Sequence, residues 1–247
     1  MSQSPVALIT GASQRIGAAI ARHLHRQGWR LLIHCRQPSA AGDELCRELN
    51  AARADSTRLL YADLQQLSAV QQLAGDALSA WQRVDALINN ASGFYPTAMG
   101  AVSEQDWDSL LGSNLKGAFF LSQALLPALR QQRGAIVNIV DIYADKPLAG
   151  HPVYSIAKAG LAMMTRALAV ELAPEVRVNG IAPGAILPPM ASDEFGELEQ
   201  RNVSERVPLQ RWGKPDNIAD TVAFLLRSDS YINGQIIAVD GGRSLSI

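Results

Sequence analysis

The sequence alternates between short β-rich runs and longer segments of helical periodicity along its whole length. Such alternation is typical of βα units that build a parallel sheet with both faces buried. The predicted strands are Val6–Thr10, Arg30–Cys35, Thr57–Ala62, Ala86–Ile88, Ala135–Val140, Val176–Ile181 and Gln235–Val239. The predicted helices are Arg15–Gln27, Ala40–Asn50, Ala69–Ala80, Glu104–Arg130, Tyr154–Leu172 and Asp216–Leu226. We therefore expect an α/β fold: a doubly wound parallel sheet of about seven strands, with helices on both faces.

The composition and charge of the chain further narrow the class of protein. The chain has 247 residues and no Pro/Ser/Gly-rich linker, which predicts a single domain over residues 1–247. Lys plus Arg total 22 and Asp plus Glu total 23, so a net charge of −1 gives no support for a nucleic-acid partner or an anionic membrane. Two cysteines and four scattered histidines predict neither a disulfide framework nor a metal site. No targeting or spanning segment is evident, so we expect a cytoplasmic protein.

The turn after the first predicted strand is typical of dinucleotide binding. It reads Thr10-Gly-Ala-Ser-Gln-Arg-Ile-Gly17 and leads directly into a helix. Glycines permit a tight turn there, and the first N–H groups of the helix face a pyrophosphate. Arg15 stands where a middle glycine is expected, and its guanidinium can bond both the pyrophosphate and the polar edge of a ligand. The turn predicts a Rossmann fold.

The tip of the second predicted strand indicates which dinucleotide binds. A carboxylate there would bond the ribose 2′-hydroxyl of NAD, whereas a cation accommodates the 2′-phosphate of NADP. This chain has Arg36 and no acidic residue at that place, which favours NADPH.

Tyr154 and Lys158 form a Tyr-x-x-x-Lys pair within a predicted helix. Residues four apart lie on one face of a helix, so the ammonium can lie beside the phenol. We expect this ammonium to lower the pKa of Tyr154 and to make the phenol a usable proton donor near neutral pH.

Several motifs in this order resemble the short-chain dehydrogenase/reductase family over essentially the whole chain. They are the Thr10–Gly17 turn, Asp63-Leu64, Asn89-Asn90-Ala91, Asn114, the Tyr154–Lys158 motif, Pro183-Gly184 and Val239–Gly242. At the end of the fifth predicted strand, Asp141 replaces the serine that is common in this family. A carboxyl can hold a proton or anchor the amino and amide edge of a heterocycle, which argues against plain ketone chemistry.

The chain is most similar to the pteridine reductase branch of that family. Arg15, the run Asn90-Ala-Ser-Gly-Phe-Tyr-Pro-Thr97 and Asp141 carry this resemblance. It implies that Phe94 stacks on a flat pterin, opposite the nicotinamide. It also implies that NADPH supplies the hydride while Asp141, Tyr154 and Lys158 relay the proton.

The resemblance also assigns the remaining site residues. Cofactor binding is expected at Gly11, Ser13, Arg15, Ile16, Gly17, Arg36, Asp63, Leu64, Asn90, Ala91, Ser92, Tyr154, Lys158, Pro183 and Gly184. Substrate binding is expected at Arg15, Ser92, Phe94, Asp141, Leu148, Tyr154 and Met190, with a substrate loop around residues 185–212. Asn114 is expected to fix the region of Lys158 rather than to touch substrate.

Two other functions stay open from sequence. A carbonyl reductase of the 3-oxoacyl-carrier-protein type shares the fold and the Tyr154–Lys158 pair, and a non-catalytic NADPH-binding protein shares the fold alone. Dihydrobiopterin, dihydromonapterin and dihydrofolate share the pterin head and are not separated by the sequence. By analogy with the family we expect a homotetramer that pairs the long helices.

Overall fold

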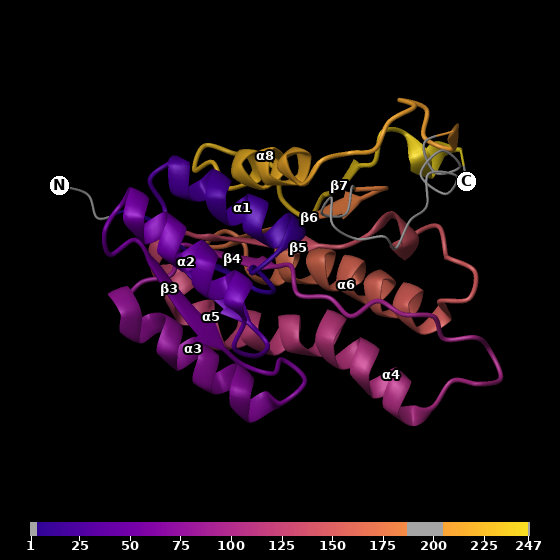
Figure 1. The fold of residues 1–247 in the computed structure, drawn as a ribbon, viewed down its shortest axis with the longest axis horizontal. Helices are drawn as coiled ribbons and strands as arrows, with labels where there is room; N and C mark the ends of the chain where they lie inside the picture. The colour runs from indigo at the N-terminus through magenta and orange to yellow at the C-terminus, as the bar shows by residue number, and fades with distance from the viewer. Residues whose placement is uncertain (1–3, 187–204, 247) are drawn as a thin grey trace.

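A seven-stranded parallel sheet forms the centre of the molecule, in the order β3-β2-β1-β4-β5-β6-β7 (Figure 1). This computed structural model describes residues 4–186 and 205–246. The strands are β1 (Val6–Ile9), β2 (Arg30–Cys35), β3 (Thr57–Tyr61), β4 (Ala86–Asn89), β5 (Ala135–Ile139), β6 (Arg177–Pro183) and β7 (Ile236–Val239). The predicted doubly wound Rossmann fold is confirmed, and β6 runs two residues beyond its predicted end.

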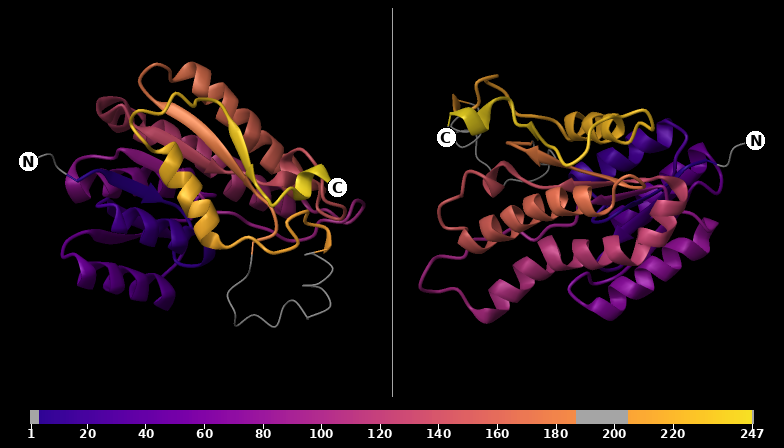
Figure 2. Two further views of the ribbon diagram at one scale, coloured as in Figure 1. Left: turned by 90° about the horizontal axis from the view of Figure 1, so that it is seen from above. Right: turned by 180° about the vertical axis from the view of Figure 1, so that it is seen from behind.

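Two layers of helices cover the sheet, as the views in Figure 2 show. The helices are α1 (Arg15–Arg26), α2 (Ala40–Ala52), α3 (Leu67–Trp81), α4 (Glu104–Leu111), α5 (Gly117–Gln132), α6 (Pro152–Glu171) and α8 (Pro215–Leu225). One face of the sheet packs against α1, α2 and α8, through residues such as Ile20, Leu45 and Val222. The other face packs against α3, α5 and α6, through residues such as Leu73, Leu125 and Ala169.

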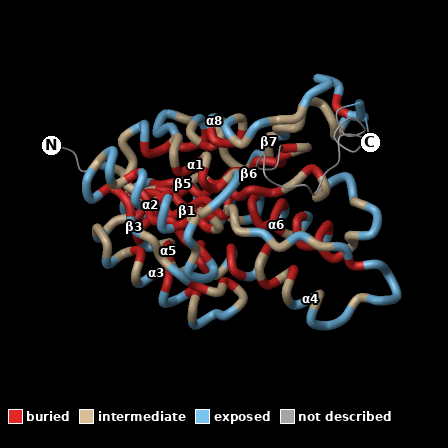
Figure 3. The backbone as a smooth tube through the Cα atoms, in the orientation of Figure 1, coloured by how far each residue is buried: buried red, intermediate tan, exposed pale blue. Residues whose placement is uncertain are grey.

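Burial explains why the strands read as continuous apolar runs. All four residues of β1 and all five of β5 are buried, because helices cover both faces of the sheet. Figure 3 shows buried backbone concentrated in the central strands, with exposed backbone in the outer loops. The apolar character of these strands follows from their position and not from an amphipathic pattern.

The prediction of one continuous α-helix over Glu104–Arg130 is wrong in one respect. A π-helical turn, Gly112–Lys116, separates α4 from α5. A π turn holds one more residue than an α turn, and such turns are frequent at functional sites. This one carries the buried Asn114.

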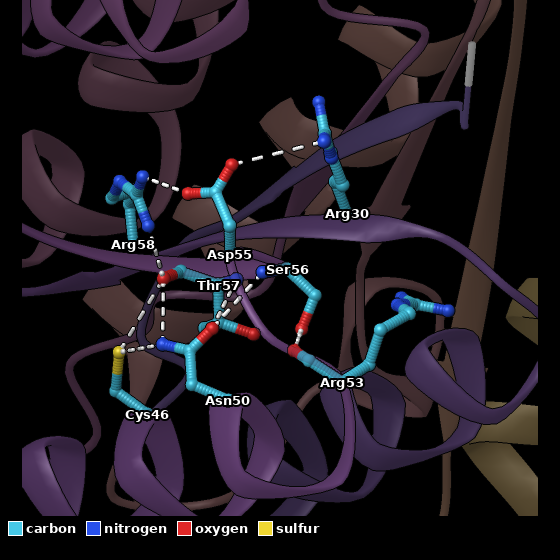
Figure 4. A network of polar contacts seen from close by, with 8 residues as sticks. All are labelled: Arg30, Cys46, Asn50, Arg53, Asp55, Ser56, Thr57 and Arg58. Carbon is cyan, nitrogen blue, oxygen red and sulfur yellow. Dashed lines mark hydrogen bonds and ion pairs between the residues drawn. The ribbon is translucent and has the colours of Figure 1, made fainter.

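A network of polar contacts fixes the start of β3, at the end of the sheet away from the strands' carboxyl termini (Figure 4). The side-chain oxygen Oδ1 of Asn50 accepts hydrogen bonds from the backbone N–H groups of Ser56 and Thr57, each at 3.0 Å. The Asn50 amide in turn donates to the Thr57 carbonyl at 2.9 Å. These bonds hold Thr57 opposite Leu31 and so set the register of β3 against β2.

Helix α6 is long and apolar enough to cross a membrane by length and composition alone, and no other described helix is. However, 56% of its most apolar window is buried inside the protein, as in a helix that packs within a folded core.

Candidate active site

A cavity of about 1000 Å³ lies along the carboxyl ends of the strands, where the strand order reverses between β1 and β4. This is where ligands bind in open α/β sheets. Its walls include these predicted site residues: Gly11, Ser13, Arg15, Ile16, Gly17, Arg36, Asp63, Leu64, Asn90, Ala91, Ser92, Phe94, Asp141, Leu148, Tyr154, Lys158, Pro183 and Gly184. Met190 and most of the predicted substrate loop lie outside the described residues.

The turn between β1 and α1 requires its glycines. Gly11 has a φ of 61°, and a Cβ there would lie 2.9 Å from Ala91 Cα. A Cβ at Gly17 would lie 2.5 Å from the Gly11 carbonyl oxygen. The Asn90 amide donates to the carbonyls of Thr10 and Gly11, both at 2.9 Å. The backbone therefore approaches closely on both sides of the turn, and side chains are excluded from it.

The amino end of α1 is left open for an anion. Within the described chain, Gln14 offers no side-chain cap and the first turn of the helix holds no acidic residue. The first N–H groups of a helix carry partial positive charge and need acceptors. A phosphate group beside Arg15 would supply them.

Arg15 adopts a backbone conformation that favours glycine, with a φ of 50°. An L-residue with a long side chain pays roughly 1 kcal/mol to occupy this left-handed region. Glycine would adopt it freely, so the arginine is held there at a cost in stability. Its side chain is exposed on the cavity wall.

We expect Arg15→Gly to raise the free energy of unfolding by about 0.5–1 kcal/mol and to weaken NADPH binding about tenfold. The first effect relieves the left-handed backbone, and the second removes a cation from the phosphate-binding turn. Urea unfolding and fluorescence titration measure the two effects. Arg133, which ends α5 with a φ of 49° at the opposite end of the sheet, provides the control. Arg133→Gly should stabilise the protein similarly and leave NADPH binding unchanged, and equal weakening by both variants would contradict the role of Arg15.

Arg36 lies at the end of β2, with its side chain exposed, and pairs with Asp63. Arg36 Nη2 is 3.3 Å from Asp63 Oδ2. An exposed pair of this kind contributes little to stability, so the guanidinium can exchange Asp63 for a phosphate at little cost.

Asp141 and Tyr154 form the polar centre of the cavity. Tyr154 Oη donates to Asp141 Oδ2 at 2.7 Å, and the Tyr143 N–H donates to Asp141 Oδ1 at 2.9 Å. Asp141 caps the short turn Ile142–Ala144 that follows β5, whereas Tyr154 projects from the first turn of α6. Both carboxylate oxygens are therefore held, and the phenol is aimed by one of them.

Burial raises the pKa of Asp141 above its ordinary value, and the bonds from Tyr154 and Tyr143 only partly oppose it. Burial also raises the pKa of Tyr154, and the Asp141 carboxylate raises it further. The expectation that Lys158 lowers the pKa of Tyr154 is wrong in this structure, because burial and the Asp141 carboxylate raise that pKa. The two groups titrate as one coupled pair that retains a proton above the pH at which an ordinary aspartic acid loses it.

Lys158 is buried beside this pair but makes no hydrogen bond to it among the described residues. Its Nζ donates to the Ile139 carbonyl at 2.9 Å and lies 5.7 Å from the centre of the Tyr154 ring. Burial lowers the pKa of Lys158 to about 8, and Asp141 opposes this shift. The ammonium is thus positioned to act on the pair through its field.

Phe94 is exposed and covers one side of the cavity. Its ring stacks on His151, with centroids 4.8 Å apart and planes at 10°, and meets Tyr154 edge to face at 4.9 Å. His151 therefore supports the ring from behind, a role that the sequence did not indicate.

Asn114 makes no direct hydrogen bond to Lys158 among the described residues, and its expected link to the Lys158 region through water stays a prediction. Its Oδ1 accepts from Ser92 Oγ at 2.7 Å, and its Nδ2 donates to the carbonyls of Gly93 at 3.0 Å and Leu110 at 2.9 Å. The π turn places this amide where it joins the Ser92–Gly93 segment to the end of α4. Asn114 thus fixes the loop that carries Phe94.

Several cavity residues were not predicted. Among them, Tyr143 and Arg243 line the wall, and Arg243 Nη2 donates to Tyr143 Oη at 3.1 Å. Tyr143 lies two residues beyond Asp141, and Arg243 directly follows the Gly241-Gly242 pair. Proximity to recognised motifs was the available signal for both. A phosphate-binding turn at the switch of a parallel sheet, beside a buried Tyr–Lys pair and a carboxyl group, defines a dinucleotide-dependent oxidoreductase.

Sequence comparison places the chain within this class. The enoyl-(acyl carrier protein) reductase family model matches residues 11–244. Pteridine reductase 1 of Leishmania tarentolae is 35% identical, over 98% of this chain and 97% of that protein. A 3-oxoacyl-(acyl-carrier-protein) reductase of Staphylococcus epidermidis is 34% identical, over 96% and 97%. A hydroxy(phenyl)methylsuccinyl-CoA dehydrogenase subunit of Thauera aromatica is 38% identical, over 98% of each. The chain belongs to the short-chain dehydrogenase/reductase family, whose members use NAD(P)H.

Proposed function

We propose that this protein is an NADPH-dependent pteridine reductase that reduces a C=N bond of a dihydropterin to give the tetrahydro form. The observation that carries the proposal is the 2.7 Å bond between Tyr154 Oη and Asp141 Oδ2, beside the exposed ring of Phe94. Reduction of a C=N bond needs a proton at nitrogen, and this pair retains one in the wall of a cavity of about 1000 Å³.

The residues present fit a dinucleotide. The side-chain-free turn at Gly11 and Gly17 and the uncapped end of α1 suit a pyrophosphate, and Arg36 suits a 2′-phosphate. When bound, the reduced nicotinamide supplies the hydride for the ring carbon. Lys158 and Tyr154 would hold the nicotinamide ribose, by resemblance to the family.

The chain's own residues orient the substrate and deliver the proton. Phe94 offers an aromatic face to the pterin, and His151 stacks on its other face. Asp141 and Tyr154 hold the proton that the ring nitrogen takes up as the adjacent carbon gains the hydride. Arg15 lies on the cavity wall and, in this proposal, bonds the polar edge of the ring as well as phosphate.

A 3-oxoacyl thioester reductase is the second candidate, because relatives of that class match about as well as the pteridine reductase does. Asp141 distinguishes the two. A carboxyl group can hold the proton that a ring nitrogen takes up and can also bond the amino and amide edge of a heterocycle, whereas a ketone oxygen needs only a hydroxyl that donates a hydrogen bond. The same site argues against a non-catalytic role, since Tyr154 and Lys158 are both buried in the cavity wall.

The proposal is tested by following NADPH oxidation with parallel substrates: dihydrobiopterin, dihydromonapterin, dihydrofolate and a 3-oxoacyl thioester. We expect the pterins to be reduced, and the thioester to be reduced at least 10²-fold more slowly, which is the scale of the effect of a missing acid catalyst. Efficient turnover of the thioester without turnover of any pterin would replace the proposal by the second candidate.

We expect Arg36→Ala to weaken NADPH binding about tenfold and to leave NADH binding unchanged, because only NADPH carries the 2′-phosphate. Fluorescence titration with both cofactors measures the difference. Arg47, an exposed arginine that pairs with Glu44 on α2, is the matched control as Arg47→Ala. Equal loss of both cofactors in Arg36→Ala would show that this residue does not read the phosphate.

We further propose that the protein is a cytoplasmic homotetramer that acts on a small pterin or folate. Exposed apolar side chains on α4, α5 and α6, among them Trp107, Phe119 and Met163, support helix pairing between subunits. A monomer at micromolar concentration in sedimentation would contradict the assembly. The near-neutral charge supports neither a nucleic-acid nor a membrane partner.

A further inference from the structure

His34 is buried at the carboxyl end of β2, between two segments of the cofactor site. On one side lies the turn at Gly11, and on the other lies Ala62, which precedes Asp63 and Leu64. The residue lines the cavity wall, yet no catalytic step uses it. A buried imidazole in such a place needs partners for both ring nitrogens.

Both ring nitrogens have partners. The Gly11 N–H donates to His34 Nδ1 at 3.3 Å, and His34 Nε2 lies 2.9 Å from the Ala62 carbonyl oxygen. The next N–H of the turn, from Ala12, donates to the His34 carbonyl at 3.0 Å. One residue therefore holds two consecutive N–H groups of the phosphate-binding turn.

These partners define one form of the ring. A carbonyl can only accept, so Nε2 carries the proton, and an N–H can only donate, so Nδ1 carries none. Protonation at Nδ1 would place two donors face to face and release the Gly11 N–H. The contacts are therefore satisfied by the neutral imidazole alone.

The charges around His34 are few. Asp63 follows β3 and is paired with Arg36 from the end of β2, and the neighbouring Cys35 is a buried thiol. Burial lowers the pKa of His34, and the Ala62 bond and Asp63 oppose the shift only in part. The ring thus stays neutral near pH 7 and gains its proton only in acid.

We infer that His34 is a positioning residue that fixes the phosphate-binding turn for the dinucleotide, and that it does so only as a neutral imidazole. Its bonds to Gly11 and Ala62 lock the turn to the segment that leads to Asp63. The amino end of α1 then faces the phosphates without reordering on binding. The inference depends on dinucleotide binding and not on which substrate is reduced.

Isothermal titration with NADP⁺ between pH 8 and pH 5 tests the inference without any substrate. The 2′-phosphate of NADP⁺ itself titrates at about pH 6. The affinity of each variant is therefore compared with that of the wild type at the same pH. In the wild type we expect binding to weaken about tenfold more over this range than in His34→Asn, whose amide oxygen replaces Nδ1 and does not titrate. His34→Asn should bind within about threefold of the wild type at pH 8, and His34→Leu should bind about tenfold more weakly.

His25 supplies the control. It is also buried, on α1, and its Nε2 lies 2.7 Å from Ser56 Oγ, away from the cavity. His25→Asn should keep the pH dependence of the wild type. The inference is overturned if His34→Asn shows the same acid weakening as the wild type, or if a folded His34→Leu binds NADP⁺ normally. Loss of pterin turnover with NADP⁺ binding as expected would overturn the proposed function and leave this inference standing.

Discussion

Tyr154→Phe and Asp141→Asn should each lower kcat for a dihydropterin by at least 10²-fold, the usual scale for loss of general acid catalysis. NADPH should bind within about threefold of the wild type, because neither change removes a phosphate ligand and Lys158 still holds the nicotinamide ribose when Tyr154 is replaced. The phenol and the carboxyl share one hydrogen bond of 2.7 Å, so each substitution disables the same proton-transfer unit. The double variant should therefore be no slower than the slower single one. Steady-state kinetics and cofactor titration measure all three.

The pH profile gives the same pair a second test. A general acid works only while it is protonated, and burial raises the pKa of Asp141. Wild-type kcat/KM should hold to a higher pH than an ordinary aspartic acid allows and then fall as pH rises. Asp141→Asn should lose that fall, whereas Asp145→Asn, on the exposed loop nearby, should keep it. For the kinetic test above, additive losses of kcat in the Tyr154→Phe/Asp141→Asn double variant would show that the phenol and the carboxyl act separately.

Lys158→Met should stabilise the protein at pH 7 while lowering kcat about 10²-fold, as expected for loss of a preorganised charge beside the reacting groups. Burial lowers the pKa of Lys158 from 10.5 to about 8. The folded state therefore binds this proton less tightly than the unfolded state does. Stability from this group is present above pH 10.5 and is lost as pH falls to about 8. The burial cost is about 3 kcal/mol, and the lost bond to Ile139 reduces the expected gain to about 2 kcal/mol.

Urea unfolding at pH 7 and pH 9.5 measures the effect of Lys158. The wild type should gain stability over this interval relative to Lys158→Met, and other titrating groups cancel in the comparison. Lys116→Met, an exposed lysine, is the control and should change neither value. A less stable Lys158→Met at pH 7 would show that the ammonium's attraction to Asp141 and its bond to Ile139 outweigh burial.

Most of the fold could be predicted because apolar runs and turn glycines, which mark the strands and turns, are visible in short stretches of the sequence. Apolar runs such as Ala135–Val140 are buried on both faces, and the strands at these positions agree with the prediction to within two residues. The phosphate-binding turn was predictable because its glycines stand out in the sequence, and in the structure Gly11 has a positive φ and a close backbone contact that exclude a side chain. The same turn also predicted that the site lies at the carboxyl ends of the strands.

What the sequence did not predict depends on distances across the fold. The pKa of Tyr154 is raised because Asp141 and burial reach it from other elements, and helical spacing shows only Lys158. Asn114 contacts the Ser92–Gly93 segment because a π turn shifts it, and no periodicity reveals a single extra residue in a helix. His34 bridges three strands' ends, a relation that exists only in the folded chain.

The π turn at Gly112–Lys116 also limits how this chain can change in length. It holds one residue more than an α turn, so deleting one residue there would restore an ordinary α turn and leave α4 close to its present orientation relative to α5. Deleting one residue within α4 or α5 instead would turn one helix by about 100° relative to the other. Helix α4 packs on α6, whereas α5 packs on α3, so that rotation would expose one of the two interfaces. A deletion scan along 104–132 should therefore tolerate the loss of one residue best within 112–116, provided that Asn114 is kept, and should not tolerate it elsewhere in the segment.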